Sequence, residues 1–192
     1  KIMLIDNKKS SKLGEVLKDN IQNNCKLSII SSYFTLYGFF YLKKALDKVQ
    51  STRLIINSKQ FKDDLNLLLS TKSEIKLKNN FQQSKIAKEC YEWLRQKAQI
   101  KDIKIENSIP FNLYHLQNIN NNDFAIQGSS NLSSDGLGYT HSNIFAMNIG
   151  INDYNSTKDL LNSFDEIWNN EDMVEDIKED ILKNLENIFK YN

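Results

Sequence analysis

The stretch Gly128-Ser-Ser-Asn-Leu-Ser-Ser-Asp-Gly-Leu137 directly follows a short apolar segment at residues 123–127. A short apolar run that ends in glycine is typical of a buried strand entering a turn. The turn presents the hydroxyls of Ser129 and Ser130 and the amide of Asn131, and we expect a helix to begin after it. Backbone N–H groups at such a helix N-terminus bind anions. The stretch therefore predicts either a phosphate-holding turn or a serine-rich turn that only caps a helix.

The segments around this turn have the patterns of helices and strands that alternate first and then cluster. Amphipathic or apolar-striped segments predict helices at 9–24, 36–49, 61–69, 82–98, 156–169 and 173–189. Short apolar runs predict strands at 26–34, 53–57, 100–105, 109–116, 123–127 and 143–151. This order predicts an α/β fold, with a mixed sheet flanked by helices on both faces. We expect residues 1–192 to form a single domain, and the start at Lys1 suggests a piece of a larger protein.

Charge is unevenly distributed along the 192 residues, although the formal net charge is only +1. From Asp159 onward there are ten acidic residues and three lysines, so residues 1–158 carry a net charge of +8. A basic body is compatible with a polyanionic ligand, and solvated helix faces explain the same pattern without one. The two Cys and two His have no metal-ligand spacing, so we expect no metal and no other cofactor. No apolar run is long enough to cross a bilayer, and two Cys favour a reducing, cytoplasmic location.

The pattern Gly-Ser-Ser-Asn-Leu-Ser-x-x-Gly-Leu at 128–137 resembles the second half of the phospholipase D superfamily motif. It is most similar to the nuclease-like branch found in restriction-type endonucleases and at the N-terminus of bacterial superfamily 2 helicases. Segments 27–35, 86–93 and 164–169 resemble the early strand, the central helix and the late helix of that branch. The resemblance implies a phospholipase D-like fold over the whole chain.

The resemblance also implies a metal-independent phosphodiesterase chemistry. In that family a His-x-Lys pair lies on the strand before the turn, and its His attacks phosphorus to form a phosphohistidine. The Lys, Asn and Ser hold the phosphoryl oxygens, and a second His protonates the leaving oxygen. Two copies of the motif build one site, so a chain with one copy is expected to form a homodimer.

This sequence departs from the family pattern at the nucleophile. When segment 113–116 is aligned with the residues that follow His-x-Lys, Pro110 takes the place of the His and Asn112 that of the Lys. Proline offers no nucleophile, and the Asn112 amide donates hydrogen bonds without a charge. The family carboxylate should fall within 143–148, where Phe145 stands. Loss of a covalent nucleophile commonly costs about 10⁶-fold in rate.

His115 offers an alternative nucleophile in a shifted register, as His115-Leu-Gln117 in place of His-x-Lys. Successive side chains of a strand point to opposite faces. If Asn112 faces the site, His115 therefore faces away unless a bulge intervenes. The other histidine, His141, follows the turn in an expected loop.

Three functions remain open from the sequence. The first is a catalytically impaired domain that binds nucleic acid, DNA above all, through Asn112, Ser129 and Asn131, with Ser130 as part of the same phosphate-holding remnant. It would dimerise and serve a bacterial helicase or a defence or restriction protein, with the motor possible in the same parent chain. The second is an active metal-independent nuclease that uses His115. The third is a protein–protein module in which the turn only caps a helix.

Overall fold

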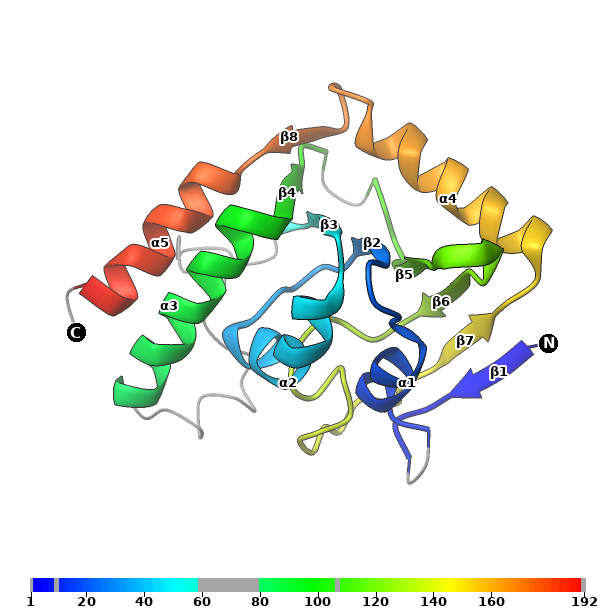
Figure 1. Ribbon diagram of the computed structural model, residues 1–192, viewed down its shortest axis with the longest axis horizontal. Helices are drawn as coiled ribbons and strands as arrows, with labels where there is room; N and C mark the ends of the chain where they lie inside the picture. The colour runs from blue at the N-terminus through cyan, green and yellow to red at the C-terminus, as the bar shows by residue number, and fades with distance from the viewer. Residues whose placement is uncertain (1, 9–10, 59–79, 106–107, 191–192) are drawn as a thin grey trace.

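A computed structural model describes residues 2–8, 11–58, 80–105 and 108–190. Its centre is one mixed sheet with the strand order β1-β7-β6-β5-β2-β3-β4-β8, and only the β2–β3 and β3–β4 pairs are parallel (Figure 1). The strands are β1 (Ile2–Ile5), β2 (Lys26–Ile30), β3 (Ser51–Ile56), β4 (Ala98–Ile103), β5 (Asn112–Gln117), β6 (Phe124–Gly128), β7 (Asn148–Ile151) and β8 (Val174–Asp176).

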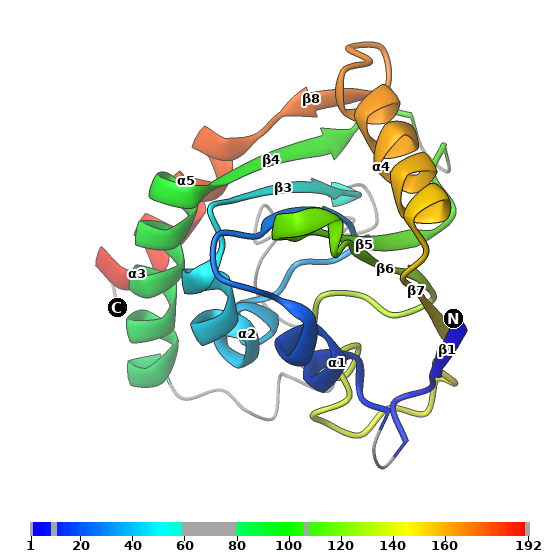
Figure 2. The same ribbon diagram turned by 45° about the vertical axis from the view of Figure 1, so that its right-hand side comes forward.

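Helices cover both faces of this sheet, which confirms the predicted α/β architecture. One face carries α1 (Leu13–Asn20), α2 (Leu36–Lys48), α3 (Asn80–Lys97) and α5 (Lys178–Lys190). The other face carries α4 (Tyr154–Trp168), which Figure 2 shows on the far side of the strands from α1, α2 and α3. A short 3-10 turn, η3 (Ile119–Asn121), links β5 to β6.

Two separate cores fill the space on the two faces. The larger core lies under α1, α2, α3 and α5, and the smaller one lies under α4 around Phe164 and Trp168. Successive side chains of a strand point to opposite faces, so each strand contributes to both cores. Ile29 of β2 belongs to the larger core and Ile30 to the smaller. The face on which a β5 side chain lies therefore decides which helices it meets.

The last helix starts later than its periodicity predicts. We predicted a helix over 173–189, but residues 174–176 pair antiparallel with β4 as β8, and α5 begins at Lys178. The Asp176 carboxylate accepts from the Lys178 backbone N–H at 2.8 Å, which separates the strand from the helix. The helix predicted at 61–69 lies outside the described residues. In the part of the chain that the structure covers, no helix has the length and apolar character needed to span a membrane.

Candidate functional site

The serine-rich turn packs against the end of β2 and the first turn of α2. Leu132 pairs with Phe34 in an isolated parallel bridge, and its backbone N–H donates to the Ser31 hydroxyl at 2.9 Å. Thr35 caps α2, because its hydroxyl accepts from Gly38 N at 3.0 Å. A Cβ on Gly38 would lie 2.4 Å from the Leu132 carbonyl oxygen. Only glycine allows α2 to approach the turn this closely.

Asn112 and Asn131 converge on one backbone group at the end of β2. The Ser32 N–H donates to Asn131 Oδ1 at 3.0 Å and to Asn112 Oδ1 at 3.3 Å. A carboxamide that accepts through its oxygen has its two N–H donors left for another partner. Among the described residues, neither Nδ2 of Asn112 nor Nδ2 of Asn131 has an acceptor. The structure thus brings the side chains of Asn112 and Asn131 together at the Ser32 N–H.

Ser130 anchors the turn and has little left to offer a ligand. Its backbone N–H donates to Asn148 Oδ1 at 3.1 Å, and its hydroxyl accepts from Asn148 Nδ2 at 2.9 Å. Its carbonyl accepts from the Tyr114 hydroxyl at 2.8 Å. Burial raises the pKa of Tyr114 well above its ordinary value, so this phenol stays a donor. Ser130 is itself buried, and its role here is to fix the turn against β5 and β7.

Ser129 differs from Ser130 because it is exposed. Its hydroxyl accepts from Met147 N at 2.9 Å, which leaves its own proton for a further acceptor. Ser129 therefore stands as a third donor on the same turn as Asn131.

The helix expected after the turn does not form, which corrects one of our predictions. Residues 132–140 make successive turns instead. The Ser133 hydroxyl accepts from Gly136 N at 3.1 Å, and Gly138 takes a φ of +87°. The Ser133 contact has the geometry of a helix cap, and the left-handed conformation of Gly138 stops a helix from continuing. The segment after Asn131 consequently supplies no regular helix N-terminus, and the donors that the turn offers are side chains.

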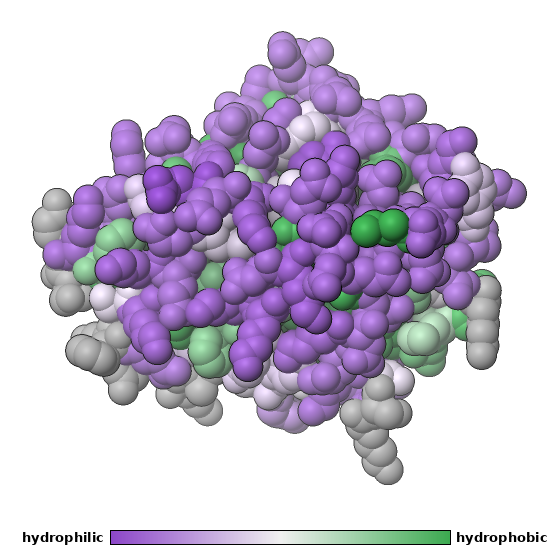
Figure 3. All heavy atoms as spheres, in the orientation of Figure 1, coloured by the Kyte–Doolittle hydropathy of each residue, from purple (hydrophilic) through white to green (hydrophobic). Residues whose placement is uncertain are grey.

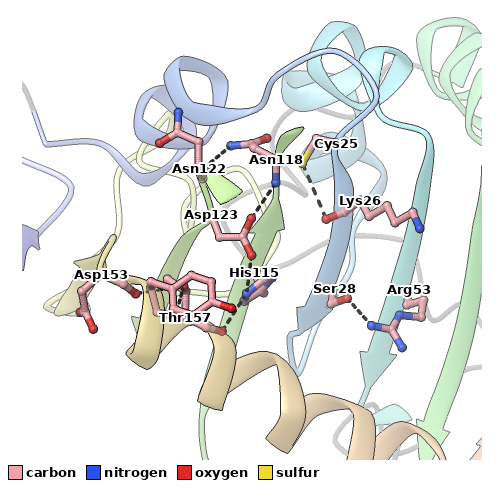
Figure 4. A network of polar contacts seen from close by, with 11 residues as sticks. Cys25, Lys26, Ser28, Arg53, His115, Asn118, Asn122, Asp123, Asp153 and Thr157 are labelled. Atoms are coloured by element: carbon pink, nitrogen blue, oxygen red, sulfur yellow. Dashed lines mark hydrogen bonds and ion pairs between the residues drawn. The ribbon is translucent and has the colours of Figure 1, made fainter. Parts of the chain in front are cut away.

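His115 lies on the opposite face of β5, under α4. It is fully buried, and its Nε2 lies 2.9 Å from the Thr157 carbonyl oxygen and 4.0 Å from Asp123 Oδ2 (Figure 4). Its Nδ1 is buried with no partner among the described residues. Burial lowers the pKa of His115, although the nearby Asp123 charge opposes this shift. The structure thus does not bring His115 together with Asn112 and Asn131.

The remaining sequence-predicted positions do not join the amide pair. Pro110 is exposed and precedes β5, and Phe145 is 85% exposed. In segment 143–148 it is Asn148 whose side chain enters the network, where the family carboxylate was expected. His141 is exposed and 3.2 Å from Asn143 Oδ1. The described residues contain no cluster of three His, Cys, Asp or Glu able to hold a metal ion.

Sequence reasoning missed three contributors to this site. Ser31 and Ser32 fall within the strand predicted at 26–34, and the Ser-Ser-Tyr-Phe order at its end was the signal for a turn. Asn148 carried no signal, because the chain contains many asparagines and its partners lie far away in sequence.

Comparisons with known proteins identify the fold. The sequence matches no protein-family model and no curated protein. The structure is similar to Nuc, a phospholipase D family member from Salmonella typhimurium, with a TM-score of 0.55, 12% identity and coverage of 92% of this chain and 97% of that one. It is also similar to phosphatidylserine synthase from Haemophilus influenzae, with a TM-score of 0.58 and 8% identity, over 98% of this chain and 43% of that protein. The resemblance expected from the turn at 128–137 is thereby confirmed at the level of architecture, and this chain has a phospholipase D-like fold.

Proposed function

We propose that this domain holds a phosphodiester of nucleic acid, DNA above all, and does not cleave it by itself. The observation that carries the proposal is the pair of amides, Asn112 and Asn131, whose oxygens share the Ser32 N–H and whose Nδ2 groups are left as donors. Two such donors can bind the anionic oxygens of one phosphate, and the Ser129 hydroxyl is a further donor on the same turn.

The same geometry argues against the family's usual chemistry. Pro110, two residues before Asn112, supplies no nucleophile, and Asn112 supplies no cation. His115 lies across the sheet with its Nε2 at the Thr157 carbonyl. A covalent mechanism without its nucleophile is slowed by about 10⁶-fold. The site therefore retains the groups for holding a phosphate without those for attacking it.

The test is binding and cleavage of fluorescent single- and double-stranded DNA and RNA, with EDTA present to silence contaminating metal nucleases. We expect binding at low salt without cleavage, and weaker binding by Asn131→Ala. Asn155→Ala, an exposed residue on α4, is the matched control and should bind like wild type. Cleavage that survives EDTA and is lost in Asn131→Ala would establish an active nuclease instead. Absence of any binding would overturn the proposal.

We also infer that two copies associate next to the turn. Large exposed hydrophobic side chains flank Ser129 on β1, on β7 and on the segment before it; they are Ile2, Met3, Leu4, Ile144, Phe145, Met147 and Ile149. Figure 3 shows hydrophobic surface at the edge of the molecule where β1 lies, beside a mainly hydrophilic face. Exposed apolar groups gathered at a sheet edge mark an association surface. Light scattering should give the molar mass of a dimer. Phe145→Ser should lower this mass toward that of the monomer, and the control Tyr154→Ser, on α4, should leave it unchanged.

The wider setting that we propose is a cytoplasmic bacterial helicase or a defence or restriction protein. The support is the resemblance of segments 27–35 and 128–137 to the domain of that branch. The reading frame on either side of the encoded segment can be examined for a Walker A motif and the other motifs of a helicase motor. A frame that contains only unrelated domains would remove the helicase setting and leave the nucleic-acid proposal intact.

A further inference from the structure

A basic groove lies between α2 and α3, on the same face of the sheet as the amide pair. Its volume is about 660 Å³. Five lysines from three helices line it: Lys18 of α1, Lys43, Lys44 and Lys48 of α2, and Lys85 of α3. Asp47 and Glu89 are the acidic residues of the lining. The groove is therefore net positive, and Figure 2 shows the helices that form it next to one another.

Part of this positive charge is not neutralised by ion pairs. Lys43 pairs with Glu89 at 3.0 Å, and Lys18 lies 3.9 Å from a Glu15 oxygen. The exposed lysines Lys44, Lys48 and Lys85 have no ion pair within the described part of the chain. Ammonium groups left on a concave surface attract a polyanion and release its counterions when it binds.

An exposed aromatic ring stands in the same groove. Phe40 is 40% exposed, and its ring meets the edges of Tyr37 and Tyr41 at centroid distances of 6.4 Å and 5.4 Å. Tyr41 in turn stacks on Tyr139 at 4.7 Å, and the Tyr139 backbone N–H bonds to Ser134 in the turn region. The aromatic groups thus form a continuous contact from the groove to the segment that follows Asn131.

We propose that this groove binds a single strand of nucleic acid that continues from the phosphate held at Asn112 and Asn131. The inference rests on the proposed function and adds the path and the strandedness of the ligand. Lys44 lies eight residues after Leu36, so it is about 12 Å along α2 from the helix end that abuts the turn. Phe40 offers its ring to an unpaired base, while the lysines contact phosphates. A duplex keeps its bases stacked inside and makes no use of Phe40.

The lysines are tested by the salt dependence of binding to a fluorescent oligonucleotide. Each phosphate contact in a single strand contributes about 0.7 to the slope of log affinity against log salt. Lys44→Gln/Lys48→Gln should therefore reduce that slope by about 1.4. The control Lys158→Gln/Lys183→Gln removes the same charge from α4 and α5 and should leave the slope unchanged.

The aromatic contact is tested by replacing Phe40. Phe40→Ala should weaken binding of a single strand by about tenfold or more, which is the effect expected of one lost base stack. Phe40→Trp keeps a flat ring and should retain affinity, which separates stacking from any loss of fold. Tyr154→Ala, an exposed aromatic on α4, is the control and should bind normally.

The outcomes separate this inference from the proposed function. If Asn131→Ala weakens binding while the lysine and Phe40 variants bind like wild type, the groove is not part of the ligand path and the inference is wrong. If a duplex binds more tightly than a single strand, and Phe40→Ala changes neither affinity, the proposal that the groove binds a single strand is wrong. If the wild-type chain binds no nucleic acid, both proposals fall.

Discussion

Side chains on the two faces of β5 lie in different surroundings. Asn112 faces the turn at 129–131, and its amide meets that of Asn131 at the Ser32 N–H. His115, three residues later, faces α4 and is sealed from solvent against Thr157. One face leaves donors available, whereas the other encloses the more reactive side chain.

The difference teaches that chemical type alone does not identify a site. Strand alternation separates positions 112 and 115, and the paired strands show no extra residue between them. Histidine is the residue most often used in acid–base chemistry, yet here burial lowers the pKa of His115. The uncharged asparagines keep their Nδ2 groups without an acceptor among the described residues.

The largest expected effect is at the amide pair of Asn112 and Asn131. Asn112→Ala/Asn131→Ala removes two hydrogen bonds to a charged phosphate, each worth about 1.5–3 kcal/mol. Affinity for nucleic acid should fall by about 100-fold or more, measured by fluorescence polarisation at low salt. His115→Gln should leave the affinity for nucleic acid unchanged. A comparable loss of affinity in that variant would contradict the claim that only the face of β5 with Asn112 binds the ligand.

The next effect concerns the close approach of α2 to the turn. Gly38→Ala places a Cβ at 2.4 Å from the Leu132 carbonyl oxygen, so backbone must shift. We expect a loss of about 2 kcal/mol in unfolding free energy, because overpacking outweighs the better helix propensity of alanine. Urea denaturation measures this loss, and Lys44→Ala, at an exposed position of the same helix, should be nearly neutral. An equally stable Gly38→Ala would show that the contact is not tight.

The buried His115 should make the free energy of unfolding depend on pH. Since the pKa of His115 is lowered below its ordinary 6.5 in the folded state, the unfolded state binds the proton more readily. Stability is therefore full above pH 6.5 and falls on acidification, by at most about 1.4 kcal/mol per pH unit. His115→Gln should flatten the change between pH 7 and pH 5, as read from denaturation midpoints. His141→Gln, at an exposed histidine, should retain the wild-type slope.

The smallest effect is at the cap that orients α2. Thr35→Ala removes the hydroxyl that accepts from Gly38 N and should cost about 1 kcal/mol in unfolding free energy. Thr35→Ser retains the oxygen and should recover most of that loss in the same denaturation assay. If serine is no better than alanine, the stabilisation comes from the threonine methyl group instead.

Local patterns were enough to predict much of the fold. The apolar run at 26–34 and the stripe of α3 each depend on neighbours within a few residues. They predicted the α/β class and the helices on both faces. The start of the last helix was wrong, because residues 174–176 pair with β4, about 70 residues earlier in the chain.

The site was predictable only in part, for a related reason. The motif at 128–137 singled out Asn131, and its alignment singled out Asn112, since both depend on sequence order. Asn148 became visible only through contacts with Ser130 and with Ile5, which lies 143 residues away. The helix predicted after the turn is absent because the chain reverses at Gly138, where φ is +87°.

The pairing of β1 with β7 has a consequence for how the domain folds. Ile5 pairs with Asn148, so this edge closes a loop of more than 140 residues. Contacts of such long sequence separation slow folding, because the entropy of closure is lost before the contact stabilises the chain. We expect β1 to pair with β7 late in folding. In the native state, we expect the backbone amides of β1 to exchange their hydrogens faster than those of the other strands. Since Asn148 bonds both Ile5 and Ser130, fraying of β1 removes one of the contacts that hold Asn148 against the turn.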